Sequence, residues 1–236
     1  MSSTKNKPQM PGEPSKPPAH TVLLLSGGLD SSVLLADLLR RGDRVTALGC
    51  DYGSRHNRRE LACARRLCAG REVPFQILHL GFIGACFRSH LLKGGGELPR
   101  DPYDEASMRQ TVVPFRNGIL LAAAAGFAES VGAQAVAIAA HAGDHALYPD
   151  CREAFMRSMA GAVRLGTYAR IRLLRPYVHR SKAWIVARGA RLGVDFAQTW
   201  SCYAGGRRHC GTCGTCRERR EAFRRAGIDD PTGYEA

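Results

Sequence analysis

The sequence predicts an α/β fold built on a doubly wound, mainly parallel sheet. Two observations lead to this prediction. Short, continuous apolar runs of the kind found in buried parallel strands alternate with longer segments of helical periodicity. The chain has 236 residues and is 44% hydrophobic, which suits one large core better than two independent ones. Strands joined through helices form right-handed parallel crossovers, so the alternation favours a sheet with helices on both faces.

The first elements follow an N-terminal tail. Residues 1–19 are rich in Pro, Ser, Lys and Gly, and we expect them to form a disordered tail because they bury little apolar surface. After His20 the run "TVLLLS" predicts a buried strand. The next run, "DSSVLLADLLRRG", predicts a helix that ends in a basic turn and a glycine cap. The alternation then predicts a strand, a helix and a strand over 44–53, 58–71 and 75–82.

A long connection precedes the second half of the predicted domain. Residues 88–113 are expected to form a loop, and a loop of this length in a compact domain is usually functional. Beyond it the pattern predicts helices over 116–132, 151–166 and 181–193, and strands over 133–141 and 171–177.

The composition bears on the partner and the compartment. The formal net charge is +13. A basic surface attracts phosphates, nucleotides, carboxylates or RNA, although solvated arginines without any partner explain the same charge. The N-terminus has no apolar signal segment, and runs such as "GILLAAAAGFA" are too short to cross a bilayer. We therefore expect a cytoplasmic protein.

The bend between the first strand and the first helix predicts a phosphate site. Gly27 and Gly28 lack a Cβ, so the backbone can turn sharply and a ligand can approach it closely. The first amides of the following helix have no acceptor within the helix and carry partial positive charge. Ser26, Ser31 and Ser32 add hydroxyl groups. These features predict an anion cradle, with an ordinary capped turn as the alternative.

Four of the nine cysteines gather near the C-terminus. Cys202 is followed at a short distance by Cys210, Cys213 and Cys216, which have two residues between successive sulfurs. Four thiolates close together match a closed, structural Cys₄ zinc site. A disulfide pair, a redox-active pair and an iron–sulfur cluster are the alternatives, and the cluster is the strongest of them.

The motif "SGGLDSS" resembles the phosphate-binding loop of the PP-loop ATP pyrophosphatases, which have an adenine nucleotide alpha hydrolase-like fold. The resemblance implies that ATP and Mg²⁺ are cofactors and that ATP is split to AMP and pyrophosphate. It implies a nucleotide-binding α/β domain over residues 20–198. It also implies that the nucleotide is bound by one continuous segment: Leu25, Ser26, Gly27, Gly28, Leu29, Asp30, Ser31, Ser32, Val33, Leu34 and Leu35.

Longer motifs resemble the 7-cyano-7-deazaguanine synthases of the queuosine pathway. They are "DYGSRH", "VPFRN", "HAGDHALYPDCREAF", "RPYVHRSKAWIV" and "TWSCYAGGRRHCGTCGTCRERREAF". This resemblance implies that 7-carboxy-7-deazaguanine is adenylated by ATP, that ammonia displaces AMP to give an amide, and that a second ATP drives dehydration to the nitrile. It also implies a Zn²⁺-binding C-terminal segment, residues 199–236, packed on the same domain, and a homodimer.

The expected catalytic residues are Asp30, Lys182 and Arg219. A carboxylate suits Mg²⁺, and Lys182, the only lysine after Lys93 in an Arg-rich chain, suits a phosphate as a compact charge. Residues that follow strand ends or begin a helix are expected to bind the substrate, because ligands lie at the carboxyl ends of parallel strands. They are Asp51, Tyr52, Arg116, Asn117, Asp144, Tyr148, Asp150 and Arg152.

Two departures from the expected family pattern accompany these predictions. Phe115 stands where a small or polar residue is expected, which bears on the substrate pocket, and the spacing from His56 to Glu60 is one residue longer than expected. Three alternative functions stay open at this point. They are a PP-loop enzyme that modifies tRNA, a non-enzymatic nucleotide-binding zinc adaptor, and a relative that stops at the amide.

Overall fold

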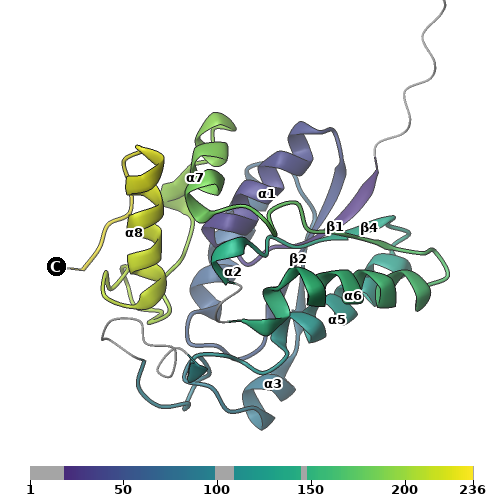
Figure 1. The fold of residues 1–236 in the computed structure, drawn as a ribbon, viewed down its shortest axis with the longest axis horizontal. Coiled ribbons are helices and arrows are strands. Elements are labelled where there is room, and N and C mark those ends of the chain that lie inside the picture. The colour runs from purple at the N-terminus through teal and green to yellow at the C-terminus, as the bar shows by residue number, and fades with distance from the viewer. Residues whose placement is uncertain (1–18, 99–108, 145–147, 236) are drawn as a thin grey trace, which may run out of the picture.

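A computed structural model describes residues 19–98, 109–144 and 148–235 (Figure 1). The predicted tail, residues 1–19, lies outside this description except for Ala19. One five-stranded sheet, in the order β3-β2-β1-β4-β5, organises the molecule, and every neighbouring pair is parallel. Its strands are β1 (His20–Leu24), β2 (Arg44–Asp51), β3 (Phe75–His79), β4 (Ala135–Ala137) and β5 (Arg172–Leu174). The predicted doubly wound parallel sheet is confirmed.

Helices cover both faces of the sheet (Figure 1). One face carries α1 (Leu29–Arg40), α2 (Asn57–Ala69), α7 (Lys182–Arg191) and α8 (Gly214–Ala226), which share a single apolar cluster. The other face carries α3 (Gly81–Cys86), α5 (Arg116–Ser130) and α6 (Glu153–Leu165). Three short 3₁₀ helices, η1 (Ala142–Asp144), η2 (Pro149–Cys151) and η3 (Phe196–Gln198), lie in the connections.

The alternation of side chains along β1 creates these two cores. Val22 and Leu24 pack with α5 and α6, whereas Leu23 and Leu25 pack with α1 and α7. This is the period of two expected of a strand, and every residue of β1 is buried. Because helices cover both faces of the sheet, the sequence of β1 is a continuous apolar run.

The element boundaries differ from the sequence prediction where a strand loses its partner. β3 ends at His79, which pairs with Asp51, the last residue of β2. The chain then forms α3, so the last residues of the predicted strand over 75–82 are helical. The predicted strand over 133–141 is likewise reduced to β4, whose partner β5 ends at Leu174. Helix α8 was not predicted, because its sequence is dominated by charged residues and buries few apolar side chains.

The reversal of strand order between β1 and β4 determines where a ligand fits. β2 and β3 extend the sheet to one side of β1, and β4 and β5 extend it to the other. In sheets of this type the crevice outside the carboxyl ends of the strands binds ligands at such a switch point.

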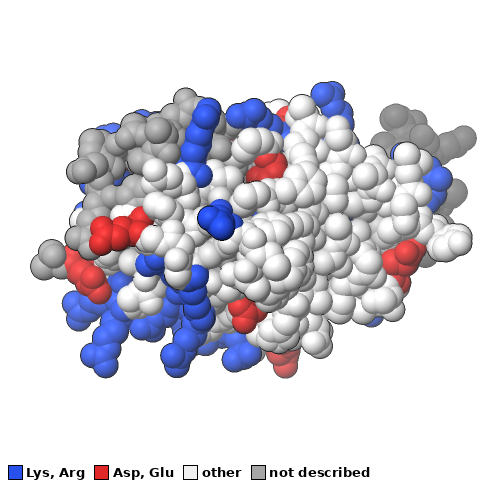
Figure 2. Space-filling model, turned by 90° about the horizontal axis from the view of Figure 1, so that it is seen from below, with Lys and Arg blue, Asp and Glu red and all other residues white. Residues whose placement is uncertain are grey.

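The charged residues are distributed unevenly over the surface. Figure 2 shows Lys and Arg gathered toward the end of the molecule at which α8 lies in Figure 1, next to a broad uncharged face. Within the described ranges, no helix combines the length and the hydropathy that a bilayer crossing requires.

Candidate active site

The bend between β1 and α1 is fixed by close backbone contacts. Gly27 has φ +86°, and a Cβ at this position would lie 2.3 Å from the carbonyl oxygen of Glu60 on α2. On its other side, the carbonyl oxygen of Gly27 accepts a hydrogen bond of 2.9 Å from the amide of Trp200. Only glycine satisfies both the positive φ and this close approach.

The first turn of α1 leaves donors directed at the bend. The first bond within the helix runs from the amide of Ser32 to the carbonyl oxygen of Gly28 at 3.1 Å. The amides before Ser32 therefore have no acceptor inside the helix. The hydroxyl of Ser26 accepts from the amide of Gly28 at 3.1 Å and lies 3.1 Å from the hydroxyl of Ser31. Helix amides and hydroxyls together form an anion-binding bend.

A cavity of about 220 Å³ opens beside this bend, at the carboxyl ends of β1, β2 and β4. Among the residues predicted to act in the site, the cavity is lined by Leu25, Ser26, Gly28, Asp30, Ser31, Tyr52, Arg116, Asn117 and Asp144. The other predicted residues do not line it: Gly27, Leu29, Ser32, Val33, Leu34, Leu35, Asp51, Tyr148, Asp150, Arg152, Lys182 and Arg219. Within α1, the two faces of the helix separate the lining residues from the others. The apolar side chains point into the core: Leu29, Val33, Leu34 and Leu35.

Arg116 supplies a positive charge to the cavity from the start of α5. Its guanidinium stacks against the rings of Tyr52 and Tyr148, with centroids at 5.8 and 5.9 Å. It donates one hydrogen bond, of 3.4 Å, to the hydroxyl of Tyr52. Within the described part of the chain Arg116 forms no ion pair with a carboxylate. A guanidinium in this state can accept an anionic ligand in the planar, two-pronged geometry that suits a carboxylate.

Asn117 and Asp150 are paired with each other. The carboxylate of Asp150 accepts from the amide of Asn117 at 2.8 Å and from its side chain at 3.4 Å. Asp150 thereby satisfies the N-terminus of α5, which explains why it is buried outside the cavity. Tyr148 is similarly engaged, since its hydroxyl lies 3.2 Å from that of Tyr203.

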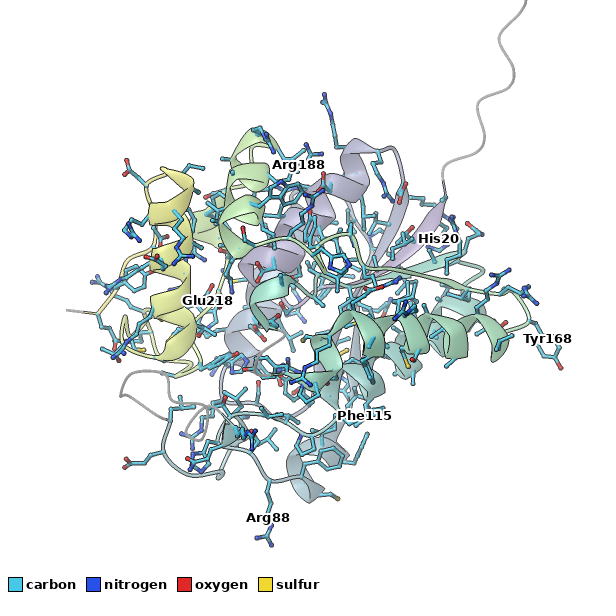
Figure 3. All side chains as sticks on the ribbon, in the orientation of Figure 1. His20, Arg88, Phe115, Tyr168, Arg188 and Glu218 are labelled. Carbon is cyan, nitrogen blue, oxygen red and sulfur yellow. The ribbon has the colours of Figure 1, made fainter. Side chains whose placement is uncertain are left out.

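Lys182 is held in a group of carboxylates at the start of α7. Its Nζ lies 2.7 Å from Glu218 and 3.5 Å from Asp30. Burial acts to lower the pKa of Lys182, but the charges of Asp30, Glu218 and Asp144 outweigh it and raise the pKa well above the usual range. The ammonium is therefore permanent at neutral pH. Figure 3 shows Glu218 on α8, the last helix of the chain.

His141 lies at the centre of the same group. Its Nε2 is 3.8 Å from Asp30, 3.5 Å from Asp144 and 4.0 Å from Glu218. The donor atoms of His141, Asp144 and Glu218 are close enough to share a metal ion. However, the amide of Gly143 donates to Nδ1 at 3.1 Å, so Nε2 carries a proton and cannot ligate in this arrangement. The carboxylates remain the donors that suit Mg²⁺.

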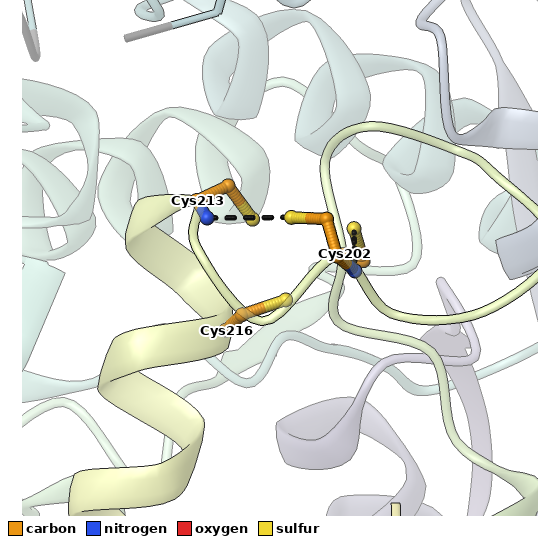
Figure 4. A group of neighbouring side chains, drawn as sticks. Cys202, Cys213 and Cys216 are labelled. Atoms are coloured by element: carbon orange, nitrogen blue, oxygen red, sulfur yellow. Dashed lines mark hydrogen bonds between the residues drawn. The ribbon is translucent and has the colours of Figure 1, made fainter. Parts of the chain in front are cut away.

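The four C-terminal cysteines come together as predicted. Cys202, Cys210, Cys213 and Cys216 offer sulfurs within 4.8 Å of one another, and none of the four forms a disulfide (Figure 4). The sulfur of Cys202 accepts from the amide of Cys210, and that of Cys210 from the amide of Cys213, both at 3.3 Å. A set of four sulfurs supported by backbone amides fits a tetrahedral metal ion.

Arg219 has a different environment from the one expected of a catalytic residue. Its side chain is 0% exposed and donates to Asp230 at 3.1 Å, to the hydroxyl of Thr199 at 2.8 Å and to the carbonyl oxygen of Phe196 at 3.0 Å. These bonds connect α8 to η3 and to the C-terminal segment around Asp230. The partners of Arg219 among the described residues are therefore structural groups of the C-terminal segment and η3.

Phe115 lies outside the cavity, so the predicted departure at this position does not reach the cavity wall. The residue has φ 51°, is 60% exposed, and its ring contacts that of Phe155 at 5.5 Å (Figure 3). The lining residues without a role assigned from the sequence include His56, Glu60 and Tyr203. His56 and Tyr203 belong to motifs that carry the family resemblance, and Glu60 follows His56 by one helical turn.

Sheet order, bend and cavity together define a PP-loop α/β protein. The chain belongs to the QueC family, described as queuosine biosynthesis protein QueC, which matches residues 20–227. It is 52% identical to the 7-cyano-7-deazaguanine synthase of Porphyromonas gingivalis over 215 residues, covering 91% of this chain and 97% of the relative. It is 49% identical to that of Desulfotalea psychrophila over 214 residues, covering 91% and 98%. Among solved structures, an NMN synthetase from Francisella tularensis is similar with a TM-score of 0.49 and 15% identity, covering 90% of this chain and 79% of that chain.

Proposed function

We propose that the chain converts 7-carboxy-7-deazaguanine, ammonia and ATP to 7-cyano-7-deazaguanine. One observation carries the proposal: the anion-binding bend and the unpaired guanidinium of Arg116 face a single cavity of about 220 Å³. A reaction between a nucleotide and a carboxylic acid requires two anion sites in one space. Membership of the QueC family, and relatives at up to 52% identity that cover nearly its full length, support the assignment of the acid.

The bend would hold the phosphates of ATP, with the α-phosphorus toward the cavity. The carboxylate oxygen of the acid attacks this phosphorus and pyrophosphate leaves. The carboxylate oxygen, a poor leaving group, thereby becomes part of AMP, which is a good one. Lys182 lies beside Asp30 and keeps its charge, so it can stabilise the negative charge that develops on the phosphates. The carboxylates of Asp30 and Asp144 would hold Mg²⁺, which neutralises the phosphates when it is bound.

The acid would enter from the opposite side of the cavity. Its carboxylate pairs with Arg116, whose orientation is fixed by Tyr52 and Tyr148. Asn117 lines the cavity and can contact the heterocycle, while Asp150 positions Asn117 from behind. We propose that Tyr148 and Asp150 shape the site without touching the substrate. The roles of Asp51 and Arg152, which do not line the cavity, stay predictions.

The four cysteines would hold Zn²⁺ in a structural site, because four protein sulfurs leave no position open for a substrate. We propose that Arg219 supports this segment through its buried bonds to Asp230 and Thr199 and does not act on phosphate. Metal analysis of the purified protein distinguishes zinc from an iron–sulfur cluster, since the cluster absorbs visible light and contains sulfide.

The environment of the cavity thiols bears on the tRNA-modifying alternative. Sulfur transfer uses a reactive thiolate. Cys50 and Cys151 line the cavity, and burial raises the pKa of Cys50 to about 12 and that of Cys151 still further. Both therefore remain thiols at neutral pH, which favours the small-molecule reaction. We further propose a homodimer in the cytoplasm, which a sedimentation measurement and cell fractionation test.

The decisive experiment supplies the purified protein with 7-carboxy-7-deazaguanine, ammonium and Mg-ATP and follows the products by mass. We expect acid to be replaced first by amide and then by nitrile, with AMP and pyrophosphate released. Accumulation of amide alone would identify a relative that stops at the amide. Absence of any mass change in metal-loaded protein that binds ATP would contradict the proposal and favour a nucleotide-binding adaptor.

A further inference from the structure

An acidic and a basic side chain face the cavity without forming an ion pair. Arg116 reaches it from α5 and Glu60 from α2, and both line its wall. In the described part of the chain, the Glu60 carboxyl group makes no hydrogen bond, and the one basic nitrogen within 4.0 Å of it is Nε2 of His56, at 3.6 Å. Because neither side chain has an oppositely charged partner, the cavity suits a cationic ligand beside Glu60 and an anionic ligand beside Arg116.

Glu60 lies directly beside the phosphate-binding bend. Its backbone carbonyl oxygen packs against Gly27, and a Cβ at Gly28 would lie 3.9 Å from its Oε1. The side chain is 15% exposed, so it is shielded from bulk solvent but open to the cavity. An acyl-adenylate formed on the bend would therefore present its carbonyl carbon near this carboxylate.

We propose that Glu60 binds the ammonium ion and accepts the proton that must leave before the nitrogen can attack. This inference rests on the function proposed above. An N–H bond of ammonium breaks and the proton moves to Glu60, giving a carboxylic acid and free ammonia. The nitrogen lone pair then forms the C–N bond, and the bond from carbon to the AMP oxygen breaks with its electron pair. The second proton, lost as the amide forms, passes to water.

The groups around Glu60 suit this role. They are His56 on the preceding turn, Tyr52 at the end of β2, Cys63 on the following turn and Arg116 on α5. Burial lowers the pKa of His56 to about 3, so the imidazole is neutral and leaves the carboxylate uncompensated. Burial also raises the pKa of Glu60 to about 8, against the opposing charge of Arg116, so most of the group is protonated at pH 7 in the free protein and a bound ammonium ion would favour the carboxylate. A base whose pKa lies near neutral pH is well matched to proton transfer.

A second use of the carboxylate has a distinct signature. The heterocycle carries adjacent N–H groups on its pyrimidine edge, and a carboxylate can accept from both. Loss of such a contact would weaken binding of the acid, whatever the nucleophile. Loss of the proton acceptor would affect only a nucleophile that arrives protonated.

The test compares ammonium with hydroxylamine, which is neutral at pH 7 and attacks without losing a proton first. We expect Glu60→Gln to lower amide formation from ammonium by about 100-fold or more, and to keep hydroxamate formation within about threefold of the wild type. Acid-dependent exchange of pyrophosphate into ATP, which needs no nitrogen, should also be retained and reports a folded site. Glu72→Gln, an exposed position just beyond α2, is the matched control.

Equal losses with both nucleophiles, or a raised KM for the acid, would overturn the inference. Glu60→Asp keeps a carboxylate and should retain more ammonium-dependent activity than Glu60→Gln; equal rates in the two variants would count against it as well. A wild-type protein that forms neither amide nor hydroxamate would instead refute the proposed function.

Discussion

The amide of Trp200 donates to the carbonyl oxygen of Gly27 at 2.9 Å. This bond connects the bend after β1 to the chain two residues before Cys202, the first cysteine of the C-terminal group. The Trp200 indole also donates to the carbonyl oxygen of Cys202 at 2.7 Å. The bend after β1 and the cysteine group are therefore mechanically joined through Trp200.

Loss of one sulfur should remove the metal and loosen the bend together. We expect Cys213→Ser to lose bound metal and about 3 kcal/mol of unfolding free energy, since the metal's binding energy contributes to folding. Metal content, thermal unfolding and ATP affinity are to be measured on the same preparation. Cys86→Ser is the control, because Cys86 is exposed and lies outside the group. A Cys213→Ser protein with full stability and activity would contradict a structural site.

The bend should not tolerate a methyl group at its first glycine. Gly27→Ala places a Cβ 2.3 Å from a backbone oxygen at φ +86°, so we expect a loss of about 3 kcal/mol or more and no measurable ATP binding. Gly42→Ala is a matched control, because Gly42 has φ +81° but nothing within 4 Å. Its cost should be about 1 kcal/mol, with ATP binding retained. Equal losses of unfolding free energy in Gly27→Ala and Gly42→Ala, measured by chemical denaturation, would show that the close contact is unimportant.

Replacement of the unpaired guanidinium should separate binding from stability. Arg116→Gln removes the partner of the acid's carboxylate, so KM for the acid should rise roughly 10- to 100-fold. Unfolding free energy should stay the same or increase, because the free protein no longer holds a partly buried charge without a carboxylate. Steady-state kinetics and guanidinium denaturation measure both. An unchanged KM would place the acid elsewhere; Arg164→Gln, on the exposed side of α6, controls for the loss of one positive charge.

The buried pair of Arg219 and Asp230 should give stability that depends on pH. Burial opposes ionisation of Asp230, but the hydroxyl of Tyr234 and the charge of Arg219 prevail and lower its pKa. A carboxyl group with a lowered folded pKa contributes stability above its unfolded pKa and loses it as the pH falls through the folded value. We therefore expect Asp230→Asn to cost about 3 kcal/mol at pH 7 and progressively less below about pH 4.

Denaturation of the wild type and Asp230→Asn across pH 2–8 measures this difference. The exposed neighbour Asp229 serves as control, and Asp229→Asn should be within about 0.5 kcal/mol of the wild type throughout. A cost for Asp230→Asn that does not change with pH would exclude the ion pair as its source.

The sequence predicts best those features that depend on local geometry. Gly27 and Gly28 identify the bend because few other residues allow it, and the cysteine spacing predicts a group that the fold then assembles. The sequence is less informative where a side chain's partner is distant in the chain. The sequence predicts substrate binding by Asp150 but does not reveal that Asp150 pairs with Asn117, nor that Glu218 pairs with Lys182. Both pairs join residues more than 30 positions apart, and no periodic pattern in a single sequence reveals such a contact.

The contact between Trp200 and Gly27 also bears on the order in which the protein is made. The bend at Gly27 is translated before Trp200, Glu218 and the four C-terminal cysteines. A growing chain therefore carries the bend long before the groups that brace it. We therefore expect the bend to reach its final geometry only after the segment around Trp200 has been synthesised.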